Sequence, residues 1–249
     1  QIKGAKILFL RRRGKNILIY LDKNRVLLIH QKMTGHLLIG KWRLPKGRSG
    51  VPVALSKGPL QEKVNQYIHL ILMLDDGRMI ALSDLRKFAK VILGSVKEIE
   101  SLPELAKLGP DPTDPKIKFS DFKKAVASRR RNIKQVLMDQ SVIVGVGNIY
   151  ADEILWAAKT HPLQPANKLI DKELKTIWTA IKRILNKAIK FRGTSTADFR
   201  DTSGKPGKYG LELLAYQRTG KPCQRCKTPI KRIKLGGRSA HFCPKCQRL

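Results

Sequence analysis

The feature that most constrains this 249-residue chain is a group of four cysteines near its C-terminus. Cys223 and Cys226 form one Cys-x-x-Cys pair, and after sixteen residues Cys243 and Cys246 form a second. This spacing is typical of two thiolate knuckles that close a tetrahedron around zinc at the end of a β-hairpin. Free thiols or two small disulfides are the alternative, although each pair is too short to staple a fold. We predict one structural Zn²⁺, because four protein ligands leave no position for water or substrate.

The charge of the chain indicates a polyanionic partner. Fifty-one Lys and Arg residues stand against nineteen Asp and Glu, which gives a net charge of +32, while the hydrophobic content of 42% is that of a globular protein. The cysteine segment itself, residues 221–249, has no acidic residue and nine basic ones: Lys221, Arg225, Lys227, Lys231, Arg232, Lys234, Arg238, Lys245 and Arg248. A strand-turn-strand with Gly236 and Gly237 at its tip could enter a nucleic-acid groove, and a solvated basic face is the alternative.

Hydropathy and cysteine placement exclude two protein classes. No apolar run approaches the roughly eighteen residues that a membrane span needs, so we expect no membrane partner. All cysteines lie within the last 27 residues, which is the wrong distribution for a secreted disulfide framework and fits a reducing compartment.

The pattern along the chain predicts an α+β protein in four parts. Short strands rich in Ile, Leu and Val are expected at 17–21, 26–29 and 67–74. Helical periodicity predicts helices at about 120–138, 148–159 and 171–191. Pro and acidic residues gather between these two regions. We therefore divide the chain into a β domain at 1–95, a linker at 96–119, a helical domain with a long loop at 120–220, and a zinc finger at 221–249.

A glycine turn before the second helix is a candidate phosphate site. Gly145-Val-Gly147-Asn148 would open the helix, with Asn148 near its N-cap and backbone N–H groups available to a phosphate. We expect the basic residues Arg129–Arg131 and Lys134 on the preceding helix. The helix terminus and these cations could then bind the backbone of one nucleic-acid strand together. A plain capped helix is the alternative.

Two segments of the β domain place apolar residues among cations. Met33 comes just before Thr34-Gly35, where a turn would hold its side chain outward. Phe88 lies close to Arg86 and other basic residues. Apolar wedges framed by cations fill gaps in stacked bases, whereas ordinary core positions are the alternative for each residue taken singly.

In combination these segments resemble the formamidopyrimidine-DNA glycosylases. The match is collinear over nearly the whole chain, and its motifs are Arg12-Arg-Gly-Lys15, His30-x-x-Met-Thr-Gly35, Asp84-x-Arg-Lys-Phe88, Met138-Asp139, Val144-Gly-Val-Gly-Asn-Ile-Tyr-Ala151, His161-Pro162, Gly193-Thr194, Gly204-Lys-Pro-Gly207 and the cysteine pairs. The resemblance implies an N-terminal β-sandwich, here incomplete, then a helix-two-turn-helix domain and a C-terminal zinc finger. It also implies an enzyme that flips an oxidised purine such as 8-oxoguanine out of duplex DNA, removes it, and nicks the abasic site.

The resemblance implies roles for individual residues. Met33, Arg86 and Phe88 would fill the vacated space and face the orphaned cytosine. Phosphate contacts would come from four residues: Arg129, Lys134, Asn148 and Arg238. The loop from Gly193 to about Gly204 would cover the flipped base. Lys15 matches a lysine assigned to proton transfer in strand cleavage. Arg238 matches an arginine with a similar catalytic role, but a guanidinium with a pKa above about 12 is a poor proton donor, so we interpret it as a phosphate clamp.

The chain departs from the family pattern in three places. Family members begin with Pro-Glu after Met removal, and the proline amine attacks C1′ of the sugar to form a Schiff base. An α-amino group titrates near 8 and is far more often neutral at pH 7 than a lysine. Gln1 aligns a few dozen residues into the family pattern. We therefore expect that the sequence lacks its N-terminal segment and that the nucleophile lies upstream of Gln1. Tyr67 replaces a usual DNA-contacting His, and Ala197 replaces a Lys or Arg of the lesion-covering loop.

Three functional hypotheses follow. The first is a bifunctional DNA glycosylase and abasic-site lyase with no small cofactor, acting as a monomer on damaged double-stranded DNA in the cytoplasm at the nucleoid. The second is a non-catalytic DNA-binding or damage-recognition zinc protein, which the chain without Pro-Glu resembles. The third is a ribosome-associated zinc-ribbon protein, which accounts for the charge and the cysteines but not for Met33, Arg86 and Phe88 together.

Overall fold

The computed structural model describes residues 2–45, 50–195 and 199–249. The chain divides into two compact units. The first unit combines Gln1–Ile99 with Lys190–Leu211, and the second combines Glu100–Ile189 with Glu212–Leu249. Among the described residues, no helix is both long enough and apolar enough to cross a membrane.

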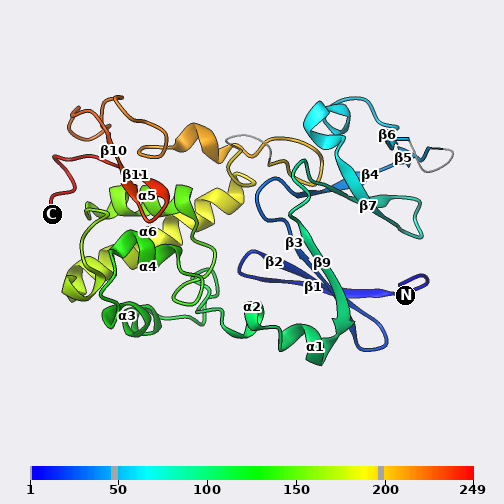
Figure 1. The fold of residues 1–249 in the computed structure, drawn as a ribbon, viewed down its shortest axis with the longest axis horizontal. Helices are drawn as coiled ribbons and strands as arrows, with labels where there is room; N and C mark the ends of the chain where they lie inside the picture. Colours follow the sequence, from blue (N-terminus) through cyan, green and yellow to red (C-terminus); the bar gives the residue numbers. More distant parts are fainter. Residues whose placement is uncertain (1, 46–49, 196–198) are drawn as a thin grey trace. The chain divides into compact units, whose positions relative to one another are not determined.

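The first unit contains two main antiparallel sheets (Figure 1). The four-stranded sheet has the order β1-β2-β3-β9 and consists of Ile7–Arg13, Asn16–Leu21, Arg25–His30 and Lys90–Ser95. The three-stranded sheet has the order β4-β8-β7 and consists of His36–Gly40, Met79–Ser83 and Ile68–Met73. A short pair, β5 (Trp42–Arg43) and β6 (Val53–Ala54), and two 3-10 turns, η1 (Pro59–Gln61) and η2 (Lys63–Asn65), complete this part. The strands predicted at 17–21, 26–29 and 67–74 are confirmed as β2, β3 and β7.

Strand pairing shows where the chain passes from one sheet to the other. The β3 strand pairs with β9 so that His30 faces Lys90, and β4 pairs with β8 so that His36 faces Ser83. The chain therefore crosses between the sheets twice at neighbouring positions, through residues 31–35 and through residues 84–89. These two crossovers carry the predicted DNA wedges.

Apolar side chains hold each sheet in place. Every residue from Val26 to Ile29 in β3 is buried, as expected for a strand covered on both faces. Leu38 and Ala81 pack with Trp42 in a separate cluster on the three-stranded sheet. Strand β1, at the edge of the larger sheet, is exposed along its whole length.

The second unit is helical and ends in a hairpin (Figure 1). Its main helices are α3 (Phe119–Ala127), α4 (Ile133–Met138), α5 (Asn148–Ala158) and α6 (Asp171–Lys190). Short elements are α2 (Pro103–Ala106) and η3 (Ala166–Lys168), together with α1 (Val96–Glu100) and η4 (Tyr209–Glu212), which both begin in the first unit. The hairpin is formed by β10 (Lys231–Leu235) and β11 (Arg238–Phe242). The long amphipathic α6 buries Leu174, Ile177 and Ile181 along the predicted face.

The single helix predicted at 120–138 is wrong. Residues 128–132 separate α3 from α4, because their backbone bonds to a distant segment instead of continuing the helix. The carbonyl oxygens of Arg129 and Arg131 accept hydrogen bonds from the N–H groups of Asn167 and Ala166, at 3.0 Å each. The three arginines therefore lie between two helices and not along one.

The segment 190–211 also differs from the prediction. We placed it in the helical domain with a long loop at 120–220, yet it groups with the β-rich unit. The Ile39 N–H donates to the Thr202 carbonyl at 2.7 Å, and the Asn65 amide donates to the Gly204 carbonyl at 3.1 Å. Contacts far apart in the sequence thus decide where this segment belongs. The predicted linker, in turn, contains α1 and α2.

Candidate nucleic-acid interface and zinc site

The four cysteines form one compact cluster of sulfur ligands. Their Sγ atoms all lie within 4.8 Å of one another. Zn–S bonds of about 2.3 Å place the sulfurs of a tetrahedral site about 3.8 Å apart, so this cluster fits one zinc ion. The knuckles are shaped by backbone bonds: Lys227 N–H donates to the Cys223 carbonyl and Gln247 N–H to the Cys243 carbonyl, both at 2.9 Å. One structural zinc, as predicted, accounts for this arrangement.

The zinc cluster is built into the hydrophobic interior of the second unit. Cys223 and Cys243 are buried and pack with Trp156 of α5. The Arg225 guanidinium lies 3.8 Å from the centre of the Trp156 ring and donates to the Trp156 carbonyl oxygen. The zinc finger therefore rests on α5, and loss of the metal would disturb both elements.

The hairpin tip presents Arg238 to solvent. Leu235 pairs with Arg238 across a two-residue turn in which Gly236 and Gly237 have φ values of +55° and +74°. Both residues need the left-handed region, which glycine reaches at little cost, so the predicted Gly-Gly tip is confirmed. A groove of about 260 Å³ runs between this tip and α4, and its lining includes Arg131, Lys134 and Arg238.

Lys134 lies in the interior, with 1% of its surface exposed. Its ammonium lies 2.7 Å from Oδ1 of Asp152 and donates to the Ser239 carbonyl oxygen. Burial lowers the pKa of Lys134, and the neighbouring Asp152 offsets only part of that effect. The phosphate contact predicted for Lys134 stays a prediction, and the structure adds a second role: the lysine ties α4 to the hairpin.

Asp152 is the centre of this buried network. Its Oδ2 accepts a hydrogen bond from the His241 N–H at 3.0 Å and lies 2.8 Å from Nδ1 of the same residue. The next residue, Glu153, accepts bonds from the N–H groups of Leu214, Ala215 and Tyr216, each at 2.9 Å. Burial raises the pKa of Glu153 despite these bonds, which lower it. Two adjacent carboxylates on α5 therefore fix β11 and the segment that precedes the finger.

Asn148 and Arg129, two further predicted phosphate contacts, are both partly exposed. Gly147 is the N-cap of α5 and Asn148 is its first residue, so the predicted place of Asn148 near the N-cap is confirmed. The Asn148 side chain makes no capping hydrogen bond, and its buried Oδ1 has no donor among the described residues. Arg129 is half-buried, and its Nε donates to the Ala125 carbonyl at 3.4 Å, which leaves the Nη groups for other acceptors.

The two crossovers of the first unit bring together the predicted wedges. Met33 is 60% exposed and Phe88 is 53% exposed, so neither is an ordinary core residue. The Arg86 guanidinium lies 4.5 Å from the centre of the Phe88 ring. Beneath them, buried Asp84 accepts hydrogen bonds from the Thr34 hydroxyl and from the Ala89 N–H, the latter at 2.7 Å. The exposed apolar and cationic side chains thus lie above a buried carboxylate that is fixed by hydrogen bonds.

The predicted lesion-covering loop is held by its own side chains where it is described. Ser195 Oγ donates to the Phe199 carbonyl at 2.5 Å and accepts from the Gly207 N–H at 2.8 Å. Asp201 caps the following turn by accepting from the N–H groups of Ser203 and Lys205. Ala197, which departs from the family pattern, lies outside the described residues.

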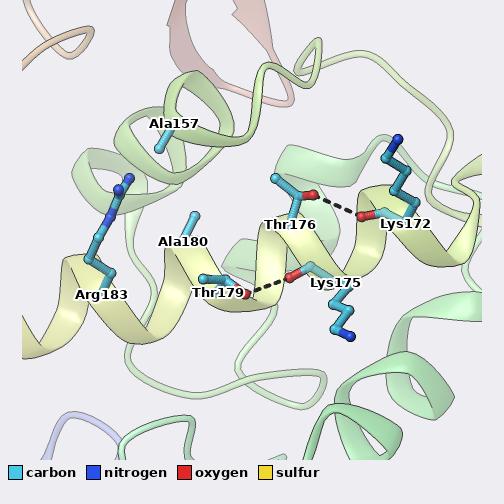
Figure 2. A pocket seen from close by; sticks show the side chains of 7 residues that line it. All are labelled: Ala157, Lys172, Lys175, Thr176, Thr179, Ala180 and Arg183. Carbon is cyan, nitrogen blue, oxygen red and sulfur yellow. Dashed lines mark hydrogen bonds between the residues drawn. The ribbon is translucent and has the colours of Figure 1, made fainter.

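A second basic groove has a different character. It lies on α6, has a volume of about 340 Å³ and is lined by Lys172, Lys175, Thr176, Thr179, Arg183 and two alanines (Figure 2). Figure 2 shows both threonine hydroxyls turned back to their own helix, where they donate to the carbonyls of Lys172 and Lys175 at 2.8 and 3.0 Å. Its cations extend into solvent, and it contains none of the predicted site residues.

Comparison with known proteins identifies the family. Three family models match: "Formamidopyrimidine-DNA glycosylase N-terminal domain" at residues 1–91, "Formamidopyrimidine-DNA glycosylase H2TH domain" at 108–200, and "Zinc finger found in FPG and IleRS" at 220–249. A formamidopyrimidine-DNA glycosylase of Herpetosiphon aurantiacus is 40% identical over 246 residues, which cover 99% of this chain and 83% of that protein. The chain belongs to the formamidopyrimidine-DNA glycosylase family.

Other members of the family give the same result. The protein of Listeria innocua is 38% identical and matches 98% of this chain and 83% of its own length. The Lactococcus lactis Fpg in complex with DNA containing an abasic site is similar with a TM-score of 0.83 at 31% identity, over 99% of this chain and 83% of that one. A structure of MutM in complex with DNA containing carbocyclic 8-oxo-G has a TM-score of 0.80 at 33% identity, over 98% and 83% of the two chains. The family assignment and the α+β fold with three domain types are confirmed.

Two family positions remain to be placed. Lys15, matched to a catalytic lysine, is exposed in the two-residue turn between β1 and β2, after Gly14 with a φ of +59°. Tyr67, where the family usually has a DNA-contacting His, stands just before β7, and its carbonyl accepts the Asp84 N–H at 2.8 Å. A histidine does occur two residues later, in β7: the Nε2 atom of His69 lies 2.9 Å from the Asp84 carbonyl oxygen.

The buried residues that hold the predicted site residues in place were not predicted from the sequence. Asp84 appeared only as the first letter of a motif, and Asp152, Glu153 and His241 were not considered. Their partners lie far away in the sequence: Thr34 is 50 residues from Asp84, and His241 is 89 residues from Asp152. An acidic pair within an otherwise apolar helix, as in Ala151-Asp-Glu-Ile-Leu155, was the available signal, because isolated buried carboxylates need partners.

Proposed function

We propose that this member of the family excises oxidised purines, such as 8-oxoguanine and formamidopyrimidines, from double-stranded DNA and then cleaves the strand at the abasic site. The chain is a DNA-repair glycosylase by family. The choice of lesion and the tasks of the individual residues are the proposal. Structures of relatives in complex with damaged DNA support it.

The observation that carries the proposal is the joint exposure of Met33 and Phe88 with Arg86 packed on the Phe88 ring. A flipped nucleotide leaves a gap in the stack, which costs a few kcal/mol to open. Two apolar side chains can fill that gap, and a guanidinium beside them can donate hydrogen bonds to the base that has lost its partner. Exposure of Met33 and Phe88 to water alone would be unfavourable and would serve no purpose.

The second unit supplies the grip on the DNA backbone in this proposal. Arg238 at the hairpin tip, the start of α5 with Asn148, and Arg129 offer donors to phosphates, while Lys134 lines the groove next to Arg238. Phosphate contacts fix the register of the protein on the duplex but carry no sequence information. Lesion choice is therefore assigned to the first unit, and affinity largely to the second.

The chemistry is proposed to use an amine nucleophile and a mobile proton. Attack of the amine on C1′ expels the damaged base, opening of the sugar ring at C1′ then gives a Schiff base, and removal of a proton from C2′ lets the 3′ phosphate leave. Lys15 is the proposed proton carrier. Arg238 remains protonated throughout, so its proposed task is to neutralise a phosphate. Zinc takes no part in the chemistry because its four positions are filled by sulfur.

The proposed working state is a monomer bound to damaged duplex DNA at the nucleoid. The bound duplex supplies all of the substrate, and each of the assigned residues comes from the same chain.

A base-release assay tests the proposal. The complete gene product is incubated with a duplex that has one 8-oxoguanine opposite cytosine, and free base and strand cleavage are measured, with the guanine duplex as control. We expect release of 8-oxoguanine and cleavage of the damaged strand. The Met33→Ala/Phe88→Ala variant should bind undamaged duplex normally and lose most of the release. Tight binding of the lesion duplex without base release would contradict the proposal and indicate a non-catalytic damage-binding protein.

A further inference from the structure

Two crossovers between the sheets present the wedge residues, and their separation is fixed by strand register. Residues 31–35 link β3 to β4, and residues 84–89 link β8 to β9. Since His30 faces Lys90 and His36 faces Ser83, the two links start and end side by side. A Cβ atom placed on Gly35 would lie 2.4 Å from the Gln31 carbonyl oxygen and 3.2 Å from the Ala89 Cβ. The turn at 31–35 therefore closes so tightly on its own backbone, with Ala89 of the other crossover beside it, that Gly35 admits no side chain.

Asp84 joins these two crossovers through a single carboxylate. Its side chain is buried, with 1% of the residue exposed. Oδ1 accepts a hydrogen bond from the Thr34 hydroxyl in one crossover and lies 3.3 Å from the Arg86 N–H in the other. Oδ2 accepts from the Ala89 N–H at 2.7 Å. The Thr34 Oγ1 also lies 3.2 Å from the Arg86 N–H, so the hydroxyl completes the link.

The donors around Asp84 match a carboxylate and no other side chain of similar size. Burial raises the pKa of Asp84, but the hydrogen bonds from Thr34 and from the backbone of 86–89 outweigh it, so that the pKa lies below its ordinary value. An amide in the same place would direct its own N–H₂ group at a backbone N–H in either orientation, that of Arg86 or that of Ala89. An Asp84→Asn variant thus keeps the shape of the side chain and removes the match.

Each wedge follows a residue held in an unfavourable backbone conformation. Lys32, before Met33, has a φ of +55°, and Lys87, before Phe88, has a φ of +57°. Left-handed backbone at a residue with a side chain persists only where the surroundings hold it. Met33 and Phe88 are themselves exposed and contribute little to holding these turns. The buried carboxylate beneath them bonds to Thr34, two residues after Lys32, and to the N–H groups of Arg86 and Ala89, on either side of Lys87.

We infer that Asp84 is a positioning residue for lesion recognition, which through Thr34 and the 86–89 backbone fixes Met33, Arg86 and Phe88 in one arrangement before DNA binds. This inference rests on the proposed function, in which those three side chains occupy the gap left by the flipped base. Side chains ordered in advance cost less to immobilise on binding. Asp84 itself is buried, so no contact with DNA is assigned to it.

The test compares Asp84→Asn with the wild-type protein and with Asp111→Asn. Asp111 is a matched control because its Oδ1 also accepts from a threonine, at 2.9 Å from the Thr113 N–H and 2.7 Å from its hydroxyl, in the other unit. A 2-aminopurine placed beside an abasic-site analogue reports wedge insertion by its fluorescence. Excision of 8-oxoguanine opposite cytosine and opposite adenine reports recognition of the orphaned base.

We expect Asp84→Asn to lose most of the 2-aminopurine signal and to reduce the cytosine-over-adenine preference by about tenfold, as loss of charge-assisted hydrogen bonds implies. Affinity for undamaged duplex should change less than about twofold, because the phosphate contacts are untouched. Thr34→Val should shift both readouts in the same direction, and Thr34→Ser should retain wild-type values. Asp111→Asn should leave both readouts unchanged.

The outcomes separate the two proposals. A folded Asp84→Asn protein with wild-type fluorescence and wild-type base preference would overturn the positioning role alone. If Asp84→Asn does not fold, a Thr34→Val protein that behaves as wild type has the same consequence. A wild-type protein that gives neither a 2-aminopurine signal nor excision would overturn the proposed function, and the role of Asp84 with it.

Discussion

At the scale of single residues, three buried carboxylates organise the surfaces that we propose contact DNA. Asp84 supports the wedges, Asp152 connects α4 with β11, and Glu153 caps the segment 214–216. A buried carboxylate is costly without partners, and each of these three has several. The exposed residues can be recognised from sequence motifs, whereas the buried carboxylates fix the positions of these exposed residues.

Removing one member of the Asp152 network should be strongly destabilising. Asp152→Ala leaves Lys134 buried without its counter-ion, so we expect the free energy of unfolding to fall by about 3 kcal/mol or more. The Asp152→Ala/Lys134→Met double variant should regain part of that loss, since no unpaired charge remains. Chemical denaturation followed by circular dichroism measures both values. A single variant as stable as the wild type would show that the ion pair contributes nothing.

The sequence predicted those residues whose roles are local. The cysteine spacing, the Gly236-Gly237 tip and the outward position of Met33 need only neighbouring residues, and the structure agrees with all three. Asp84 and Asp152 could not be predicted in this way, because the donors that satisfy them lie 50 and 89 residues away. Only the fold brings such partners together.

At the scale of elements, periodicity located helices but not every interruption. Helices α5 and α6 lie where the apolar spacing placed them, within one residue at each end. The break at 128–132 was missed because its cause is a hydrogen-bonded contact with residues 164–167. The same holds for the segment 190–211, whose backbone bonds join it to the β-rich unit.

The β10–β11 turn offers a test of element geometry. Gly237 has a φ of +74°, and a Cβ placed on it would meet nothing within 4 Å. Gly237→Ala therefore adds backbone strain without a clash, and we expect a loss of about 1 kcal/mol in stability of the zinc finger. Gly237→Asn should cost less, because asparagine tolerates the left-handed region. Thermal unfolding of the two variants decides this, and equal midpoints for alanine, asparagine and wild type would contradict it.

At the scale of the whole molecule, zinc should stabilise the second unit and leave the first intact. Trp156 packs against Cys223 and Cys243, so chelation should change its fluorescence in a variant whose other two tryptophans are replaced by phenylalanine. Duplex binding should fall sharply, while the β-sheet signal in circular dichroism persists. Full duplex affinity after verified loss of zinc would show that the metal does not hold the DNA-binding surface.

The charge of +32 predicts a strong response to salt. Each phosphate neutralised by Lys or Arg contributes about −0.9 to the slope of log K against log salt. We expect a steep slope for undamaged duplex, reduced by about 1 in Arg238→Ala. Titrations at four or more salt concentrations measure it, and a flat response would mean that the basic surface is merely solvated.

Borohydride trapping tests the central claim most directly, because a glycosylase that also cleaves abasic sites must pass through a Schiff base with the sugar. The complete gene product is mixed with a duplex bearing one abasic site, reduced with borohydride, and resolved on a denaturing gel, with Lys15→Ala alongside. We expect a covalent protein–DNA adduct in both proteins, and slower strand cleavage in Lys15→Ala if Lys15 carries a proton but is not the nucleophile. A protein that binds the abasic duplex tightly and forms no adduct would contradict the claim.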